Sequence, residues 1–334
     1  MTLFESASPR FVARISREEH GIMAGQKPLI AINMDYKAPR NNTSPVSYLF
    51  SGYYDSVMKA GGIPVIIPPY TDEEDLDRIL DMVDGVIMVG GGDLDPRNDG
   101  YMLHPSVRPM AERRESFDRM LIAKVYERRL PFFGIGAGMQ LLNVTLGGTL
   151  FLHIAEDLGS ALPHYEPDDP WHRHALAVEP GSLLDRVYGD NAILVNSMHH
   201  MAIDDVADGF LATAKCPDSV IEGIESIRDD WFALGTQFHP EAPSATVLDL
   251  RIFGEFIAGV IERSQKPLVA RFEDEIAAPA PESTKTKSKK RTAKVKVFAG
   301  EPEKKPRSKK TLKNAPIFAD ELPLLAQLGK KRCA

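Results

Sequence analysis

The chain has 334 residues, of which 43% are hydrophobic and 26% charged, and its formal net charge is −7. It holds no run of eighteen apolar residues and no uninterrupted apolar segment near its N-terminus, so we expect neither a membrane span nor a secretory signal. The two cysteines, Cys216 and Cys333, exclude a disulfide framework and a cysteine-rich zinc site, and they fit the reducing cytoplasm.

The first half of the chain alternates between strand and helix signals. Residues 1–26 show no strong periodicity, and we interpret them as an N-terminal leader. Strands are predicted at 28–33, 63–67, 85–89 and 131–135, and helices at 47–60, 73–82, 115–129 and 138–146. This alternation favours parallel strands joined by right-handed crossovers, and so an α/β fold with a doubly wound, mostly parallel sheet.

The second half is richer in strand signals. Strands are predicted at 192–196, 210–214, 220–225 and 232–238, and a closing helix at 243–262. No segment between residues 27 and 262 has the composition of a linker, so we predict a single domain over 27–262.

The composition changes after residue 262. Residues 263–334 hold 19 Lys and Arg and 8 Asp and Glu, a net charge of +11, which leaves −18 on the remainder of the chain. Clustered lysines and few apolar residues predict a disordered tail. Three interpretations stay open: a solubilising extension, contact with a polyanion such as nucleic acid or with an acidic protein, and contact with the acidic body of the same chain.

Three short segments follow predicted strands, where an open parallel sheet binds its ligands. Residues 134–138, GIGAG, have the shape of a nucleophile elbow, G-x-Nuc-x-G, with a helix N-terminus behind it. Residues 235–241, GTQFHPE, place His239 two positions before Glu241. Residues 90–96, GGGDLDP, can present backbone N–H groups to an oxyanion.

These segments resemble the class I glutamine amidotransferase-like proteins, specifically the γ-glutamyl-γ-aminobutyrate hydrolase group, peptidase family C26. The family's motifs GGGDVDP, GICRGMQLLNVxLGGTL, VNSxHHQ and GxQxHPE correspond, in order, to residues 90–96, 134–150, 195–201 and 235–241. The stretch ERRESFD at 112–118 is similar to the family's RDxFE.

The resemblance covers residues 27–262 and implies a flavodoxin-like fold. It also implies hydrolysis of a γ-glutamyl amide by a Cys-His-Glu triad. In such a triad the thiolate attacks the carbonyl, histidine moves the proton and glutamate orients the histidine. The backbone N–H groups that hold the oxyanion then correspond to those of Gly91, Gly92 and Ala137.

The sequence departs from the family pattern at the nucleophile. Gly136 stands where the family has cysteine, and Ala137 where it has arginine. Glycine has no side chain that can attack, so His239 and Glu241 remain as a base and its orienter, or as relics. Loss of a nucleophile costs on the order of 10⁶-fold in the rate of a protease triad. Neither cysteine is a natural substitute, because Cys216 lies between predicted strands and Cys333 in the tail.

Other polar residues of the motifs have two interpretations. By resemblance, Gln140, Asn196 and His199 contact the glutamyl group; alternatively, Gln140 and Asn196 satisfy loop backbone. If His199 and His200 lie on a strand, only one of them faces the pocket. Histidines are numerous in this half, but they lack the spacing of a metal site and an evident carboxylate partner, so we expect no metal and no cofactor. These are His172, His174, His199, His200 and His239.

Three functions therefore compete. The first is a catalytically inactive γ-glutamyl hydrolase-like protein that binds a γ-glutamyl or glutamine-like ligand, or regulates a partner. The second is an active hydrolase of γ-glutamyl amides that uses another nucleophile or water activated by His239. The third is a scaffold that docks a polyanionic partner through its tail. Residue 136 separates them, since the first and third predict no turnover.

Overall fold

The computed structural model describes residues 26–39, 43–159, 161–169, 171–189 and 193–265, all of which belong to one structural unit. The expected leader and the expected basic tail lie outside the described residues, apart from Gln26 and residues 263–265. Among the described residues, no helix combines the length and the apolar character that crossing a membrane requires.

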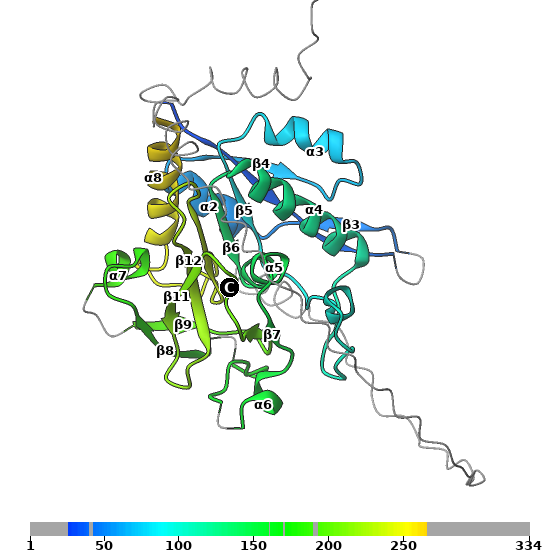
Figure 1. The fold of residues 1–334 in the computed structure, drawn as a ribbon, viewed down its shortest axis with the longest axis vertical. Helices are drawn as coiled ribbons and strands as arrows, with labels where there is room; N and C mark the ends of the chain where they lie inside the picture. The colour runs from blue at the N-terminus through cyan, green and yellow to red at the C-terminus, as the bar shows by residue number, and fades with distance from the viewer. Residues whose placement is uncertain (1–25, 40–42, 160, 170, 190–192, 266–334) are drawn as a thin grey trace, which may run out of the picture. The chain divides into compact units, whose positions relative to one another are not determined.

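Strands from both halves of the chain form the parallel part of a mixed sheet (Figure 1). Its five strands lie in the order β4-β1-β5-β6-β13, and every neighbouring pair among them is parallel. The strands are β1 (Leu29–Asn33), β4 (Ile63–Ile67), β5 (Gly85–Met88), β6 (Phe132–Ile135) and β13 (Ala233–Thr236). The helices that follow or precede them are α2 (Ser51–Lys59), α3 (Glu73–Leu80), α4 (Glu112–Arg128), α5 (Ala137–Thr145) and α8 (Arg251–Gln265). The α/β fold expected from the alternation is confirmed here.

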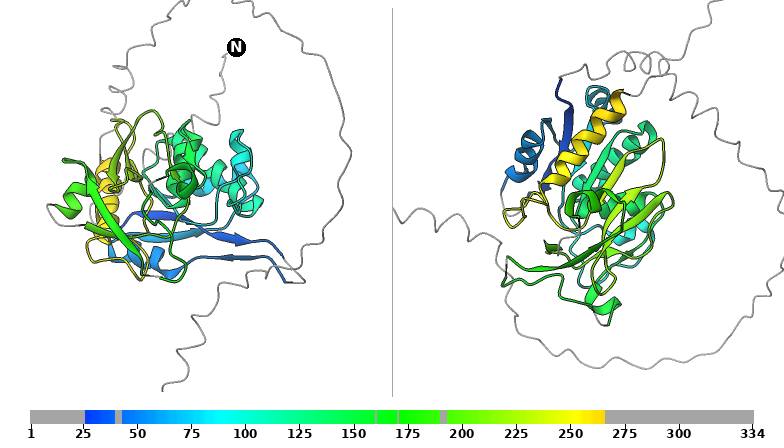
Figure 2. Two further views of the ribbon diagram at one scale, coloured as in Figure 1. Left: turned by 90° about the horizontal axis from the view of Figure 1, so that it is seen from below. Right: turned by 90° about the vertical axis from the view of Figure 1, so that its left-hand side faces the viewer.

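Helices cover both faces of this sheet, because successive strand residues point to opposite sides. On β1, for example, Ile30 and Ile32 pack with α2 and α8, while Ala31 packs with α3, α4 and α5. In the right-hand view of Figure 2, α2 (blue) and α8 (yellow) lie on one side of the strands and the cyan and green helices on the other. Two hydrophobic cores result, one on each face.

The second half of the chain extends the sheet with antiparallel strands. Beyond β13 the order continues β12-β11-β8-β9, each pair antiparallel. These strands are β12 (Ile221–Ser226), β11 (Phe210–Lys215), β8 (Arg173–Val178) and β9 (Ile193–Asn196); β7 (Leu150–Phe151) and β10 (Ala202–Ile203) pair with each other beside β12. The short helices α6 (Ile154–Asp157) and α7 (Leu183–Tyr188) and the 3₁₀ turn η1 (Pro96–Asp99) complete this part.

Two helices begin later in the chain than the sequence predicted. The helix expected from residue 47 begins at Ser51, because β3 (Val46–Tyr48) pairs with β2 (Asp35–Lys37) in a separate hairpin. The helix expected from residue 243 begins at Arg251. Before it, the Thr246 and Asp249 side chains each accept a hydrogen bond from the other residue's backbone N–H, which holds that segment in a turn.

Candidate active site

The three motif segments meet at the carboxyl ends of three adjacent parallel strands. Gly90 follows β5, Gly136 follows β6 and His239 follows β13. Because the carboxyl ends of neighbouring parallel strands lie at the same edge of a sheet, segments up to 150 residues apart in the sequence come together. This arrangement is the one that the order of the motifs predicted.

Gly136 forms the expected sharp turn between β6 and α5. Its φ is 55° and its ψ is −114°, a backbone conformation that strains any residue with a side chain. The flanking glycines are required by close packing: a Cβ on Gly134 would lie 2.7 Å from the Gly138 carbonyl carbon, and one on Gly138 would lie 2.4 Å from the Met88 carbonyl oxygen. The elbow therefore keeps its geometry although position 136 has no side chain.

His239 faces the elbow and is oriented by Glu241. Its Nδ1 lies 2.8 Å from Glu241 Oε1, and its Nε2 lies 3.2 Å from the point that a Cβ on Gly136 would occupy. Burial alone would lower the pKa of His239, but the charge of Glu241 and its hydrogen bond raise that pKa above its usual value. The base and its orienter are thus arranged as in a triad, and they face a glycine.

Asn196 fixes the backbone that carries this histidine. Its side-chain amide donates to the His239 carbonyl oxygen at 2.8 Å, and its Oδ1 accepts from the His239 N–H at 2.8 Å. The imidazole ring is confined between two glycines, since a Cβ on Gly90 would lie 2.6 Å from its Cε1. The His239 side chain is 18% exposed, so part of it is accessible to a ligand.

A buried arginine contacts the start of the Gly-rich loop, residues 90–96. Arg114, on α4, has no exposed surface; its Nη2 donates to the carbonyl oxygens of Val89 and Gly90 at 3.2 and 3.3 Å. Its Nε bonds Asp118 at 2.5 Å, and its Nη1 lies 3.0 Å from Asp35. Sequence reasoning gave this arginine no role, although it belongs to the ERRESFD stretch that resembles the family.

The expected oxyanion donors belong to two segments, since Ala137 follows Gly136 directly and Gly91 and Gly92 follow β5. Ala137 is the first residue of α5, so its N–H is one of the donors that a helix N-terminus leaves without an intrahelical partner. Gly91 packs on the buried guanidinium, since a Cβ on Gly91 would lie 3.4 Å from Arg114 Nη1, and Gly92 packs on Met110. The neighbouring Gly90 N–H is occupied, because it donates to the Tyr53 hydroxyl at 3.0 Å. An oxyanion role for Gly91, Gly92 and Ala137 stays a prediction.

A model of the peptidase C26 family matches residues 28–241, a span that includes all three motif segments. The chain belongs to the peptidase C26 family.

A Mycobacterium tuberculosis protein named, provisionally, as a glutamine amidotransferase is 35% identical over 210 residues, which are 63% of this chain and 66% of that one. Protein NtpR of Enterococcus hirae is 33% identical over 64% of this chain and 89% of its own length. The γ-glutamyl-γ-aminobutyrate hydrolase PuuD of Escherichia coli K12 is 30% identical over 61% of this chain and 82% of its own.

Two of the polar residues expected to contact a ligand bond to the protein itself in this C26 chain. Besides Asn196, the buried Gln140 amide donates to the Met201 carbonyl oxygen at 3.1 Å and to Gln237 Oε1 at 3.0 Å. This geometry corresponds to the second interpretation of these residues, in which they organise loops. Their side chains hold the 196–201 segment against the elbow helix and the His239 loop.

The two adjacent histidines of the C26 motif point to different places. They follow β9 rather than lying on it, so strand alternation does not govern them. His200 Nε2 lies 3.0 Å from Asp93 Oδ2 in the Gly-rich loop. His199 is buried, with Nδ1 3.0 Å from the Met201 carbonyl oxygen and Nε2 3.1 Å from Glu222 Oε1. The structure therefore brings His200, not His199, to the loop of the candidate active site.

Cys216 lies in a buried polar cluster and does not line the elbow. Its Sγ is 3.2 Å from His174 Nδ1 and 3.5 Å from Glu222 Oε1. Burial, reinforced by the charge of Glu222, raises the pKa of the Cys216 thiol far above its usual range. Glu222, which sequence reasoning missed, is the carboxylate partner that was not evident for the histidines.

Proposed function

We propose that this C26 protein binds a γ-glutamyl or glutamine-like compound without hydrolysing it through a covalent intermediate. The observation that carries the proposal is the pairing of an intact base and orienter with a side-chain-free elbow: His239 Nε2 is 3.2 Å from the Cβ position of residue 136, and that residue is glycine. The names of relatives such as PuuD supply the ligand class.

The chemistry of the remaining groups supports this choice. An acyl-enzyme needs a nucleophilic atom on residue 136, and glycine offers none. The Cys216 thiol is buried in another cluster, where it contacts His174 and Glu222, so it is a poor replacement. Three features support binding of a carbonyl compound: the N-terminus of α5, the glycine-rich loop of residues 90–96 and the partly exposed His239 side chain.

The test compares four proteins on γ-glutamyl-γ-aminobutyrate and glutamine: wild type, Gly136→Cys, Gly136→Cys with Ala137→Arg, and Gly136→Ala. The alanine variant is the matched control, because it adds the same Cβ without a nucleophile. We expect ligand binding but no turnover by wild type and Gly136→Ala, and measurable hydrolysis by at least one cysteine variant. Since a Cβ at 136 lies close to the ring, His239 must shift by a few tenths of an ångström.

Turnover by wild type that His239→Ala abolishes would refute the proposal and favour the alternative, an active hydrolase that uses water or another nucleophile. Failure of the wild type to bind either compound in calorimetry would refute the ligand class. Binding without turnover, with activity gained by Gly136→Cys, is the outcome that the proposal requires.

A second proposal concerns the basic segment. Its charge of +11 beside −18 on the rest of the chain favours a polyanionic partner such as nucleic acid. We expect the full chain to bind DNA or RNA with an affinity that falls steeply with salt, and a chain lacking residues 277–334 to lose that binding. Equal binding by the truncated chain would contradict it.

A further inference from the structure

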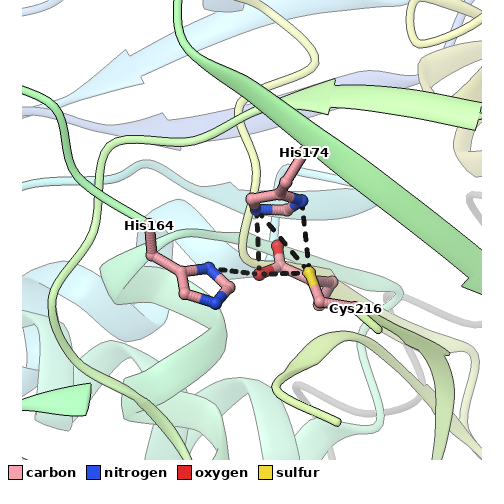
Figure 3. A group of neighbouring side chains, drawn as sticks. His164, His174 and Cys216 are labelled. Atoms are coloured by element: carbon pink, nitrogen blue, oxygen red, sulfur yellow. Dashed lines mark hydrogen bonds and ion pairs between the residues drawn. The ribbon is translucent and has the colours of Figure 1, made fainter. Parts of the chain in front are cut away.

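The side chains around Glu222 form a cluster that the proposed function does not use. It joins His164, from the loop after α6, His174 on β8, Cys216 at the end of β11 and Glu222 on β12. All four residues are buried, and one donor atom from each lies within 4.8 Å of the others. In Figure 3, His164, His174 and Cys216 lie around a carboxylate oxygen, which is Oε1 of Glu222.

Three distances between donor atoms of the cluster match those between zinc ligands. Glu222 Oε1 is 3.5 Å from His164 Nδ1, 3.4 Å from His174 Nε2 and 3.5 Å from Cys216 Sγ. Ligands at zinc distances on a tetrahedron are separated by about 3.3–3.6 Å. Good N–H···O hydrogen bonds are shorter, at about 2.7–3.2 Å.

Two atoms of the cluster make no hydrogen bond to any of the described residues. His164 Nδ1 and Glu222 Oε2 are both buried and take part in no hydrogen bond there. A buried polar atom without a hydrogen bond destabilises the fold unless something binds it. The other nitrogen of His164, Nε2, lies 2.9 Å from Asp218 Oδ2. An N–H donated to that carboxylate leaves the Nδ1 lone pair facing the cluster, which is the outer-shell arrangement typical of metal-bound histidine.

Charge balance points the same way. A thiolate from Cys216 and the Glu222 carboxylate carry two negative charges, and the two imidazoles are neutral ligands, so a divalent cation makes the buried group neutral overall. Metal binding releases the thiol proton to solvent. One sulfur, two nitrogens and one oxygen form a set that zinc prefers and that magnesium or calcium do not.

We propose that His164, His174, Cys216 and Glu222 bind a structural zinc ion. Four protein ligands leave no open position, so the ion acts by holding segments together rather than by activating water. It ties the 161–169 loop to strands β8, β11 and β12. His199 lies at the edge of the cluster, 3.1 Å from Glu222 Oε1, and orients that carboxylate.

The zinc site would also support the candidate active site. The Glu222 carbonyl oxygen accepts from the Gln237 N–H at 2.9 Å, two residues before His239. The Met201 carbonyl oxygen lies 3.0 Å from His199 Nδ1 and accepts from the Gln140 amide of the elbow helix. Fixing Glu222 and His199 therefore fixes two segments that border the elbow.

The test uses the full chain and three variants: Cys216→Ser, the matched cysteine control Cys333→Ser, and the histidine control His200→Asn. After dialysis against metal-free buffer, we expect about one zinc per chain in wild type and both controls by mass spectrometry of the metal, and loss of stoichiometric zinc in Cys216→Ser. When cobalt(II) replaces zinc, we expect a sulfur-to-metal charge-transfer band in both wild type and Cys333→Ser. A band in both proteins identifies Cys216 as the sulfur ligand.

If Cys216→Ser fails to fold, metal binding by the wild-type protein still tests the proposal. Wild type that takes up neither zinc nor cobalt(II), or cobalt(II) bound without the charge-transfer band, would overturn the proposal. Zinc that is retained by Cys216→Ser but lost in His200→Asn would overturn it too, because the ion then belongs to the histidines beside Asp93. Zinc should also raise the melting temperature of wild type but not of Cys216→Ser.

Discussion

The elbow around Gly136 and the cluster around Glu222 differ in geometry and in residue type. The elbow has the geometry: a strained turn, a helix N-terminus and a histidine oriented by a carboxylate, but no nucleophile. The cluster has the residue types, cysteine, histidine and glutamate, but they are buried and the thiol pKa is raised. Environment, and not the presence of three residue types, therefore decides whether a thiol acts as a nucleophile or as a metal ligand.

Thiol reactivity gives the largest expected difference between the two regions. In a Cys333→Ser background, Cys216 is the only thiol, and the further change Gly136→Cys adds one at the elbow. The elbow thiol has a helix N-terminus and a histidine beside it, which lower its pKa, whereas Cys216 reacts only after local opening. We expect iodoacetamide to label position 136 on the order of 10⁴-fold faster than Cys216, since such opening costs several kcal/mol.

Peptide mapping by mass spectrometry measures both rates in one sample. Labelling in denaturant is the control, because both thiols then react alike. Comparable labelling rates at the two positions in the native protein would contradict this difference, since the cluster would then be open to solvent.

Removal of the buried cation beneath the Gly-rich loop should have the next largest effect. Arg114→Met leaves the buried Asp118 without its partner, and we expect the free energy of unfolding to fall by about 3–5 kcal/mol. The matched control is Arg186→Met, which breaks an exposed ion pair with Glu255 and should cost at most about 1 kcal/mol. Urea denaturation gives both values. Equal losses would mean that Arg114 does not act as a buried counter-charge.

The His239–Glu241 pair gives a pH-dependent test of the elbow region. Because the pKa of His239 is raised in the folded protein, the stabilisation from its protonated form is fully present below the unfolded-state pKa of about 6.5 and is lost as the pH rises through the folded value. Glu241→Gln should therefore lower the pKa of His239 in an NMR titration. It should also cost about 1.5–3 kcal/mol near pH 5.5, and less near pH 8.5. A loss of stability that does not change with pH would contradict the pairing.

The sequence predicted the parallel half of the fold and the meeting of its motifs, because both depend on local signals. Each strand and helix there carries its own periodicity, and the ends of neighbouring parallel strands share an edge. The cluster was not predictable in this way. Its ligands come from segments whose pairing is antiparallel and non-local, and β8 itself was missed.

Glu222 shows why the cluster escaped sequence reasoning. The stretch IEGIES contains two glutamates, and a glutamate is ordinarily exposed to solvent. Here Glu222 is fully buried, because both faces of β12 are covered. Gly136 and His239 were predicted from a motif, whereas Arg114 needed the structure, since an arginine on a helix is usually exposed.

Substitutions at two adjacent residues, Asn196 and Ser197, test whether the elbow and the cluster are independent. We expect their effects on stability to be the smallest. Asn196 holds the backbone of His239 through two hydrogen bonds, and the Ser197 hydroxyl donates to the His164 carbonyl oxygen at 2.7 Å. Replacing either by alanine should cost about 1–2 kcal/mol of stability, since a buried backbone group loses its partner. The diagnostic readouts differ: Asn196→Ala should change the NMR titration of His239 and leave zinc content unchanged, and Ser197→Ala should weaken zinc retention and leave that titration unchanged. If each substitution shifts both readouts, the segment 196–201 couples the regions and they form one cooperative unit; if the effects separate, the metal cluster and the elbow are independent devices built on neighbouring residues.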